Sequence, residues 1–229
     1  MLKKLLRLFE ATALLTICVG FLANLAAAQH NSKPGQKAAA AQALPAPGTY
    51  QIDGDHSFAF FGARHHVIGL VRGRFDKVLG TITVSQNLTA CSVDITIDVS
   101  SISTQVHERD EDLLSPAYFD VKKFPTMTYQ GRGIRHISDN SWTMDGSLTI
   151  HGVTKVVPLT FISNGMDLSV QRGNPARASF HASAATKRAD FGMGGRDNLL
   201  ELGDATTPDV QIEIDVEMAE IGPKHRGTI

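Results

Sequence analysis

Cysteine is scarce in this chain of 229 residues, and its two cysteines do not pair in the expected mature protein. Cys18 lies in an N-terminal segment that we expect to be removed, which leaves Cys91 as the single cysteine. One cysteine cannot form an internal disulfide, so the fold must be stabilised by its own hydrophobic core. We interpret Cys91, at the start of a strand-like run, as a small buried or edge residue.

The chain also lacks an excess of charge, and no basic patch dominates it. The whole sequence carries 22 basic and 23 acidic side chains; without residues 1–28 it carries 19 and 22, a net charge of −3. Proteins that bind nucleic acid usually present clustered Lys and Arg. We therefore expect no nucleic-acid partner.

Catalytic motifs are absent as well. The sequence has no Gly-x-Ser-x-Gly elbow, no His-Glu-x-x-His, no Cys-x-x-Cys and no glycine-rich phosphate loop. The glycine-rich run at 192–195 lacks the strand–turn–helix context of a nucleotide site. His65 and His66 are adjacent on a predicted strand and would point to opposite faces, which disfavours a shared metal ion. The sequence therefore carries no catalytic signature, and we favour a protein without enzyme activity, metal site or cofactor.

One long apolar run is present, and it lies at the N-terminus. A positively charged start precedes the apolar residues 11–28, and small residues end the run at Ala28. This pattern is typical of a signal peptide, with an uncleaved membrane anchor as the alternative. Because Asn24 interrupts a run that is already near the lower limit for spanning a bilayer, we favour cleavage near Ala28 and a periplasmic or secreted location.

The remaining sequence divides into a linker, one domain and a short tail. Residues 29–47 are rich in Ala, Gln, Pro and Lys and contain almost nothing large and apolar, so we interpret them as a flexible linker. Residues 48–221 suit a single domain of common size. Residues 222–229 form the tail.

Alternating apolar and polar residues are the main pattern of this domain. The residues from 210 to 218 alternate strictly, and those from 93 to 99 do the same. Side chains on a strand point to opposite faces in turn, so each run has one apolar face, as in antiparallel sheets. Because closure removes exposed sheet edges, we predict an all-β antiparallel barrel with an apolar interior. The predicted strands are 49–53, 57–66, 69–76, 79–85, 91–99, 126–136, 141–151, 154–163, 177–187 and 209–219.

Two segments are apolar on both faces. Phe60 and Phe61 are neighbours in one of them, and Val156 and Val157 are neighbours in the other. In an antiparallel strand this pattern predicts that both faces are covered, one by packed neighbours and the other by a ligand or a helical segment. Ordinary core packing is the alternative.

One short helical segment is predicted, at about 106–118. A proline at 116 ends or kinks it, because the residue before a proline disfavours the helical conformation. The aromatic residues that follow, Tyr118, Phe119 and Phe124, are suited to plugging one end of a barrel. Arg109 and Asp110 are interpreted as a structural or capping pair, and the alternative is that Arg109 contacts an anionic head group.

Polar residues near strand ends are the other candidates for contacting a ligand. His65 and His151 each lie near the end of a predicted strand, where the mouths of barrels form. Gly152 indicates a tight bend or bulge that would hold His151 and Thr154 beside an apolar wall. We interpret these histidines first as structural residues with ordinary hydrogen bonds, and contact with a polar head group or a metal ion is the alternative.

Together these residues resemble the YceI family. The matching motifs are ordered along the chain and cover nearly all of residues 49–219. They are Asp53-Gly54-Asp55-His56-Ser57, Arg64-His65, Val71-Arg72-Gly73-Arg74-Phe75, Ser101-Ile102-Ser103-Thr104, Arg109-Asp110, Tyr118-Phe119-Asp120, Phe124-Pro125, the run from Gly146 to Thr154, and Asp190-Phe191-Gly192. The chain departs from the family at Asp112, where a histidine is usual, so no head-group preference is carried over at that position.

The resemblance implies an extended, eight-stranded lipocalin-like barrel with one short helical segment, which binds a long isoprenoid or similar amphiphile inside. A closed barrel of eight strands is wide enough for one small ligand. Phe61 and Ile150, on apolar strands, would line the cavity, and His65, Arg109 and His151 would supply polar contacts at the mouth. The ligand would be polyprenyl or quinone-like, and the protein would be a carrier that needs no cofactor.

Two other functions stay open. One is an enzyme or stress-response factor acting on such a lipid or quinone, with His65, His151 and Asp190 at the barrel mouth. The other is an interaction module whose barrel is filled by side chains.

The carrier that the resemblance implies would make transient contact with a membrane. The sequence does not define the oligomeric state, and a homodimer is one alternative.

The leader segment makes the first testable prediction. If residues 1–28 are a signal peptide, N-terminal sequencing of the mature protein from its native cell will begin at or near Gln29. Mature protein that retains Met1 and stays in the membrane fraction would contradict cleavage and favour the anchor.

Overall fold

The computed structural model describes residues 44–65, 69–167, 175–193 and 210–221 and contains mostly strands. No helix within these ranges is both long and apolar enough to cross a membrane. The strands are β1 Gly48–Ile52, β2 Phe58–His65, β3 Gly69–Phe75, β4 Val78–Val84, β5 Ser92–Asp98, β6 Ile102–Ser103, β7 Thr126–Arg132, β8 Arg135–Ser138, β9 Ser141–Ile150, β10 Val153–Asp167, β11 Arg177–Thr186 and β12 Val210–Glu220. The helices are α3 His107–Leu114 and the 3-10 turns η1 Leu88–Ala90, η2 Val99–Ser101 and η3 Arg188–Phe191.

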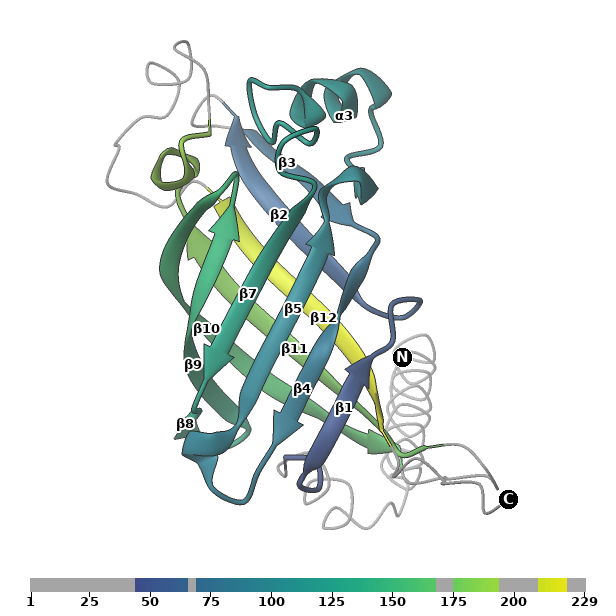
Figure 1. Cartoon of the computed structure of the whole chain (residues 1–229), viewed down its shortest axis with the longest axis vertical. Coiled ribbons are helices and arrows are strands. Elements are labelled where there is room, and N and C mark those ends of the chain that lie inside the picture. Colours follow the sequence, from purple (N-terminus) through teal and green to yellow (C-terminus); the bar gives the residue numbers. More distant parts are fainter. Residues whose placement is uncertain (1–43, 66–68, 168–174, 194–209, 222–229) are drawn as a thin grey trace, which may run out of the picture. The chain divides into compact units, whose positions relative to one another are not determined.

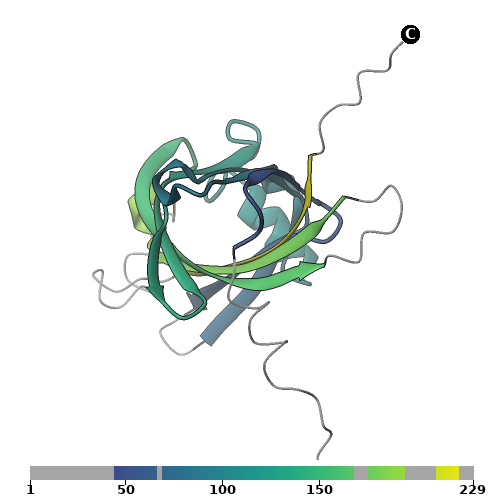
Figure 2. The same ribbon diagram turned by 90° about the horizontal axis from the view of Figure 1, so that it is seen from below.

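Eight of these strands form a closed antiparallel ring. The order around the ring is β1-β4-β5-β7-β9-β10-β11-β12, and the pairing of β1 with β12 closes it. Figure 2 shows the ring from below, with the strands enclosing an interior. The predicted all-β barrel of eight strands is therefore confirmed.

The barrel is extended at the end that carries α3, which we call the upper end (top of Figure 1). There β12 changes its neighbour: Met218 pairs with Ile52 on β1, whereas the earlier residues Val210–Asp215 pair with β2. β2 in turn pairs with β3, and β3 pairs with β6. The wall is thus longer at the upper end than the closed ring alone.

Most predicted strands agree with the observed ones to within one residue, although β10 continues to Asp167, four residues beyond its predicted end. Two further differences concern the number of strands. The predicted strand 126–136 is divided into β7 and β8, because Gly133 adopts a positive φ of 71° that interrupts extended backbone. The two-residue strand β6 was not predicted, since a pairing so short has no alternation to reveal it.

The alternating residues supply the core, as predicted. On β5, Ile95 and Ile97 are buried, and on β12, Ile214 and Val216 are buried. The prediction that both faces of the Val156 segment are covered is wrong. Val156 is 73% exposed, because the outer face of β10 meets solvent at this position, while the adjacent Val157 is buried.

Tyr129 fills the middle of the barrel from β7. Its ring lies over Gly146 on β9, where an added Cβ would come within 2.2 Å of the ring, so this approach requires glycine. The hydroxyl donates to backbone carbonyls, 3.1 Å from Val157 O and 3.3 Å from Met144 O. Burial raises the pKa of the Tyr129 phenol to about 12, so the group stays a donor to higher pH than an exposed tyrosine.

The helix α3 is fastened to the barrel through the buried Thr104. The carboxylate of Asp110 accepts from the Thr104 backbone N–H at 2.9 Å and from its hydroxyl at 2.6 Å. The Arg109 guanidinium donates to the Thr104 hydroxyl oxygen at 2.8 Å and to its carbonyl at 2.9 Å. The helix ends at Leu114, with Ser115 as its C-cap before the proline, as the sequence predicted.

This fastening generates a second prediction. Asp110→Ala leaves a buried N–H and a buried hydroxyl of Thr104 without their acceptor, and such loss costs about 1–3 kcal/mol. We expect the free energy of unfolding, measured by urea denaturation, to fall by that amount. The matched control is Asp112→Ala on the same helix, whose exposed side chain makes no hydrogen bond to the described residues. Equal destabilisation by the two variants would contradict the role of Asp110.

Candidate functional site

The upper half of the barrel contains a cavity of about 130 Å3. We call it the upper cavity. Its wall is almost entirely apolar and is contributed by strands of both sides of the ring, by the segment after α3 and by η3. Lining residues include Phe61, Phe75, Phe119, Leu148, Ile150, Val157, Phe191 and Ile212. Of the aromatic residues after the helix, Tyr118 and Phe119 line this cavity, whereas Phe124 packs against His151 instead.

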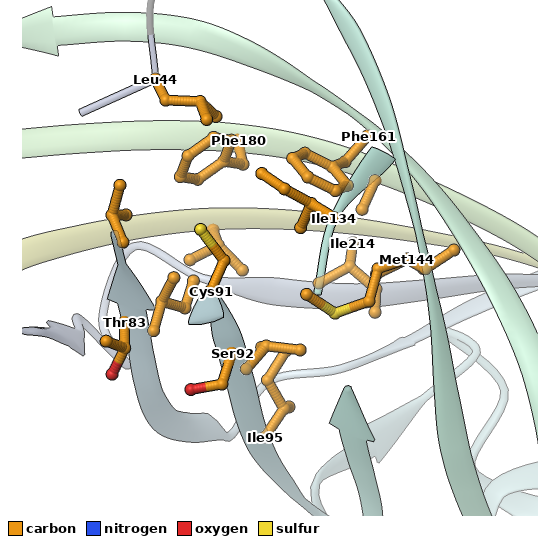
Figure 3. Close-up of a pocket in the computed structure, with 16 residues that line it drawn as sticks. Leu44, Thr83, Cys91, Ser92, Ile95, Ile134, Met144, Phe161, Phe180 and Ile214 are labelled. Carbon is orange, nitrogen blue, oxygen red and sulfur yellow. The ribbon is translucent and has the colours of Figure 1, made fainter. Parts of the chain in front are cut away.

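The lower half contains a second apolar cavity, of about 80 Å3, which we call the lower cavity. Figure 3 shows Phe161, Phe180, Met144 and Ile134 around it, together with Leu44 from the segment before β1. Lining residues from the opposite wall include Ile82, Cys91, Val93 and Ile95. Cys91 is buried, as the sequence predicted.

The interior is thus divided, where the sequence predicted one cavity. The expected strands do line it: β2 contributes to the upper cavity, β5 to both, and β12 to both. The two linings share only Leu159 and Ile214. Bulky side chains at mid-height account for the division, and alternation alone cannot show how large side chains meet across a barrel.

Phe61 and Ile150, predicted to line the cavity, both line the upper cavity. Phe61 packs on Phe75 with ring centroids 5.6 Å apart. Gly73 on the neighbouring strand β3 leaves the room that Phe61 occupies, since an added Cβ there would lie 2.5 Å from its ring. Ile150 is buried at the end of β9.

The polar candidates His151 and Asp190 come from two elements, the β9–β10 turn and η3. His151 occupies the β9–β10 turn, where His151 and Gly152 both have positive φ, 51° and 74°, the geometry of a type I′ hairpin. Its Nδ1 lies 3.3 Å from the carbonyl oxygen of Phe191, and its ring packs edge-on against Phe124 at 4.7 Å. Asp190 is exposed on η3, and no hydrogen bond in the described structure joins it to His151.

Arg109 is not among the described residues that line the two cavities. Both hydrogen bonds of Arg109 go to Thr104, so its guanidinium positions α3. His65 ends β2, and its side chain lies outside the described residues. Their predicted contact with a head group stays a prediction.

Sequence reasoning missed Arg188, the charged residue among the described lining of the upper cavity. It begins η3, and its Nη2 lies 3.5 Å from the backbone oxygen of Arg64 on β2. Thr186 on β11 lines the same region. The available clue was position, because Arg188 lies two residues before the start of the Asp190-Phe191-Gly192 motif.

A separate cluster of Asp53, His56 and Glu217 has ligand atoms within 4.8 Å of one another. Arg177 already donates to both carboxylates, at 2.7 Å to Asp53 Oδ2 and at short range to Glu217. The hydrogen bond from Arg177 to Asp53 lowers the pKa of the Asp53 carboxyl below its usual range. The cluster is explained as an ion pair that ties β11 to the ends of β1 and β12, and we assign no metal to it.

Comparisons with known proteins agree with this architecture. The family model of the YceI-like domain matches residues 50–218. A UPF0312 protein of Pseudomonas aeruginosa is 31% identical over 179 residues, covering 78% of this chain and 89% of that protein. The crystal structure of the Campylobacter jejuni YceI protein superposes with a TM-score of 0.56 and 26% identity, covering 69% of this chain and 89% of that one.

A more distant structure shares the fold. The polyisoprenoid binding domain from Saccharophagus degradans superposes with a TM-score of 0.54 at 17% identity, covering 75% of this chain and 98% of that one. The family match spans the whole barrel, from β1 to β12, and includes every strand that lines the two cavities. The chain belongs to the family of proteins with a YceI-like domain.

Proposed function

We propose that this protein binds an amphiphile with a long isoprenoid-type tail and shields that tail from water inside the barrel. The observation that carries the proposal is the upper cavity, whose wall is apolar apart from a few polar groups that include Arg188 and Thr186. Sites for small molecules commonly combine such a wall with a few polar groups that fix orientation.

The energy of binding would come mainly from the tail. Burial of apolar chain contributes about 0.8 kcal/mol per methylene, so an isoprenoid supplies affinity without directional contacts. The aromatic residues Phe61, Phe75 and Phe119 offer a large apolar surface to it. A carrier needs no catalytic residues. No hydrogen bond joins His151 to Asp190 in the described structure, which favours binding over the alternative of an enzyme at the mouth.

The comparisons support the same ligand class. The Saccharophagus degradans structure is described as a polyisoprenoid binding domain, and we extend that ligand class to this chain as part of the proposal. With the signal peptide predicted at residues 1–28, we propose that the carrier works in the periplasm or outside the cell. Exchange of the lipid would then require transient contact with a membrane.

The head group would lie near η3. Arg188 presents a guanidinium whose planar donors match carboxylate and phosphate oxygens. This position suits an anionic or strongly polar head group, with the tail extending inward past Phe61 and Ile150.

A third prediction tests burial of the tail. Phe61→Asp and Ile150→Asp each place a charge on the wall of the upper cavity, and we expect both to abolish binding of fluorescent isoprenoid analogues in a titration. The matched control is Val156→Asp, on the exposed outer face of β10, which should bind like the wild type. Circular dichroism must show each variant folded. Among tails short enough to occupy the upper cavity alone, affinity that does not rise with tail length would refute the proposal.

A fourth prediction concerns the head group. Arg188→Ala should weaken binding of a prenyl phosphate by about 1–3 kcal/mol, the usual loss for a hydrogen bond to a charged group, and leave a prenyl alcohol nearly unaffected. The same titrations with Arg109→Ala and His151→Ala test the sequence-based prediction that these two residues contact the head group. If Arg188→Ala lowers affinity for alcohol and phosphate equally, Arg188 does not contact the head group.

A further inference from the structure

A single layer of side chains separates the two cavities. Leu159 on β10 and Ile214 on β12 line both cavities. Across the interior, Ile95 on β5 lines the lower cavity, and its pairing partner Tyr129 on β7 lines the upper one. We call these four residues the middle layer. All four are buried, with exposures between 3% and 8%.

The middle layer has one fixed member and three adjustable ones. Tyr129 is held by its hydrogen bonds to the Met144 and Val157 carbonyls and by its seat over Gly146. Turning it aside would leave a buried hydroxyl without an acceptor. The aliphatic side chains have no such bonds and can change rotamer at modest cost.

The segment before β1 contributes to the wall of the lower cavity. Leu44 and Phe180 both line this cavity (Figure 3), and the Tyr50 hydroxyl holds the segment by donating to the Ala46 carbonyl at 2.7 Å. A tail that enters from the α3 end therefore reaches the lower cavity by passing the middle layer.

We propose, resting on the function proposed above, that the middle layer determines which tail lengths the protein binds. Short tails occupy the upper cavity and leave the layer in place. Longer tails displace Leu159 and its aliphatic neighbours and extend into the lower cavity, so their affinity includes the free energy needed to open the layer. The side chains of the layer, rather than those of the mouth, then set the preference for length.

The test compares two leucines of equal exposure. Leu159 and Leu148 are each 8% exposed, but Leu148 lines only the upper cavity. Affinities are measured in the full chain for prenyl alcohols of increasing length, from geraniol through geranylgeraniol to solanesol. Leu159→Ala should raise the ratio of long-tail to short-tail affinity at least about fivefold, since crowding in a packed core costs 1 kcal/mol or more. Leu148→Ala should change the affinities for all tail lengths by the same factor.

Ile214→Val serves as a milder second variant if Leu159→Ala does not fold. It should also raise the ratio of long-tail to short-tail affinity, but by a smaller factor. A ratio unchanged in either folded variant would overturn the proposal.

Cys91 offers a direct probe of the lower cavity. Cys91 lines that cavity and is buried, so the rate at which methyl methanethiosulfonate modifies Cys91 reports how accessible the lower cavity is. Peptide mapping by mass spectrometry separates Cys91 from Cys18. Solanesol should slow modification of Cys91, and geraniol at equal occupancy should not. Equal protection by both, or tight binding of solanesol without protection, would overturn the length-selecting layer.

The two proposals fail in different ways. If no prenyl alcohol binds the wild type, the proposed carrier function is wrong. If the alcohols bind but neither the affinity ratio nor the protection of Cys91 depends on tail length as stated, only the role of the middle layer is wrong.

Discussion

The pairing of β1 with β12 is the contact on which the rest of the structure depends. It converts a row of antiparallel strands into a ring, so that no long edge of the ring is left without a partner. Once the ring is closed, one face of every strand in it must point inward. The alternating residues of β5 and β12 then become the wall of an enclosed apolar space.

The same strand, β12, also explains why the two ends of the barrel differ. Its last residues pair with β1 and its first residues pair with β2, so the wall continues upward beyond the closed ring. The extended end is covered by α3, which Thr104 fastens, and by the aromatic segment that follows it. Polar groups such as Arg188 gather at this end, whereas Leu44 lines the lower cavity.

Much of the fold could be predicted from the alternation of apolar and polar residues, but the candidate site could be predicted only in part. The period of two predicted the strands, and the alternation along β9 placed Ile150 on the inner face. Phe61 also lines the upper cavity, but its segment is apolar on both faces, so alternation did not define its side. Val156 was misplaced because apolarity alone does not reveal which face has a covering layer. Arg188 and the middle layer were missed for another reason: they arise where strands distant in sequence meet, and the register and size of opposing side chains decide such contacts.

Ring closure also constrains the order in which the molecule folds. The buried Ser57 hydroxyl donates to the carbonyl of Glu217, a residue 160 positions later, and the Glu217 N–H donates back to it. Contacts of such long range form slowly, because the chain must lose much entropy before they contribute. Neighbouring hairpins such as β9–β10 can form early. A nascent chain that lacks β12 is therefore an open sheet with exposed apolar faces, and the ligand-sized interior exists only after the last strand has joined the first.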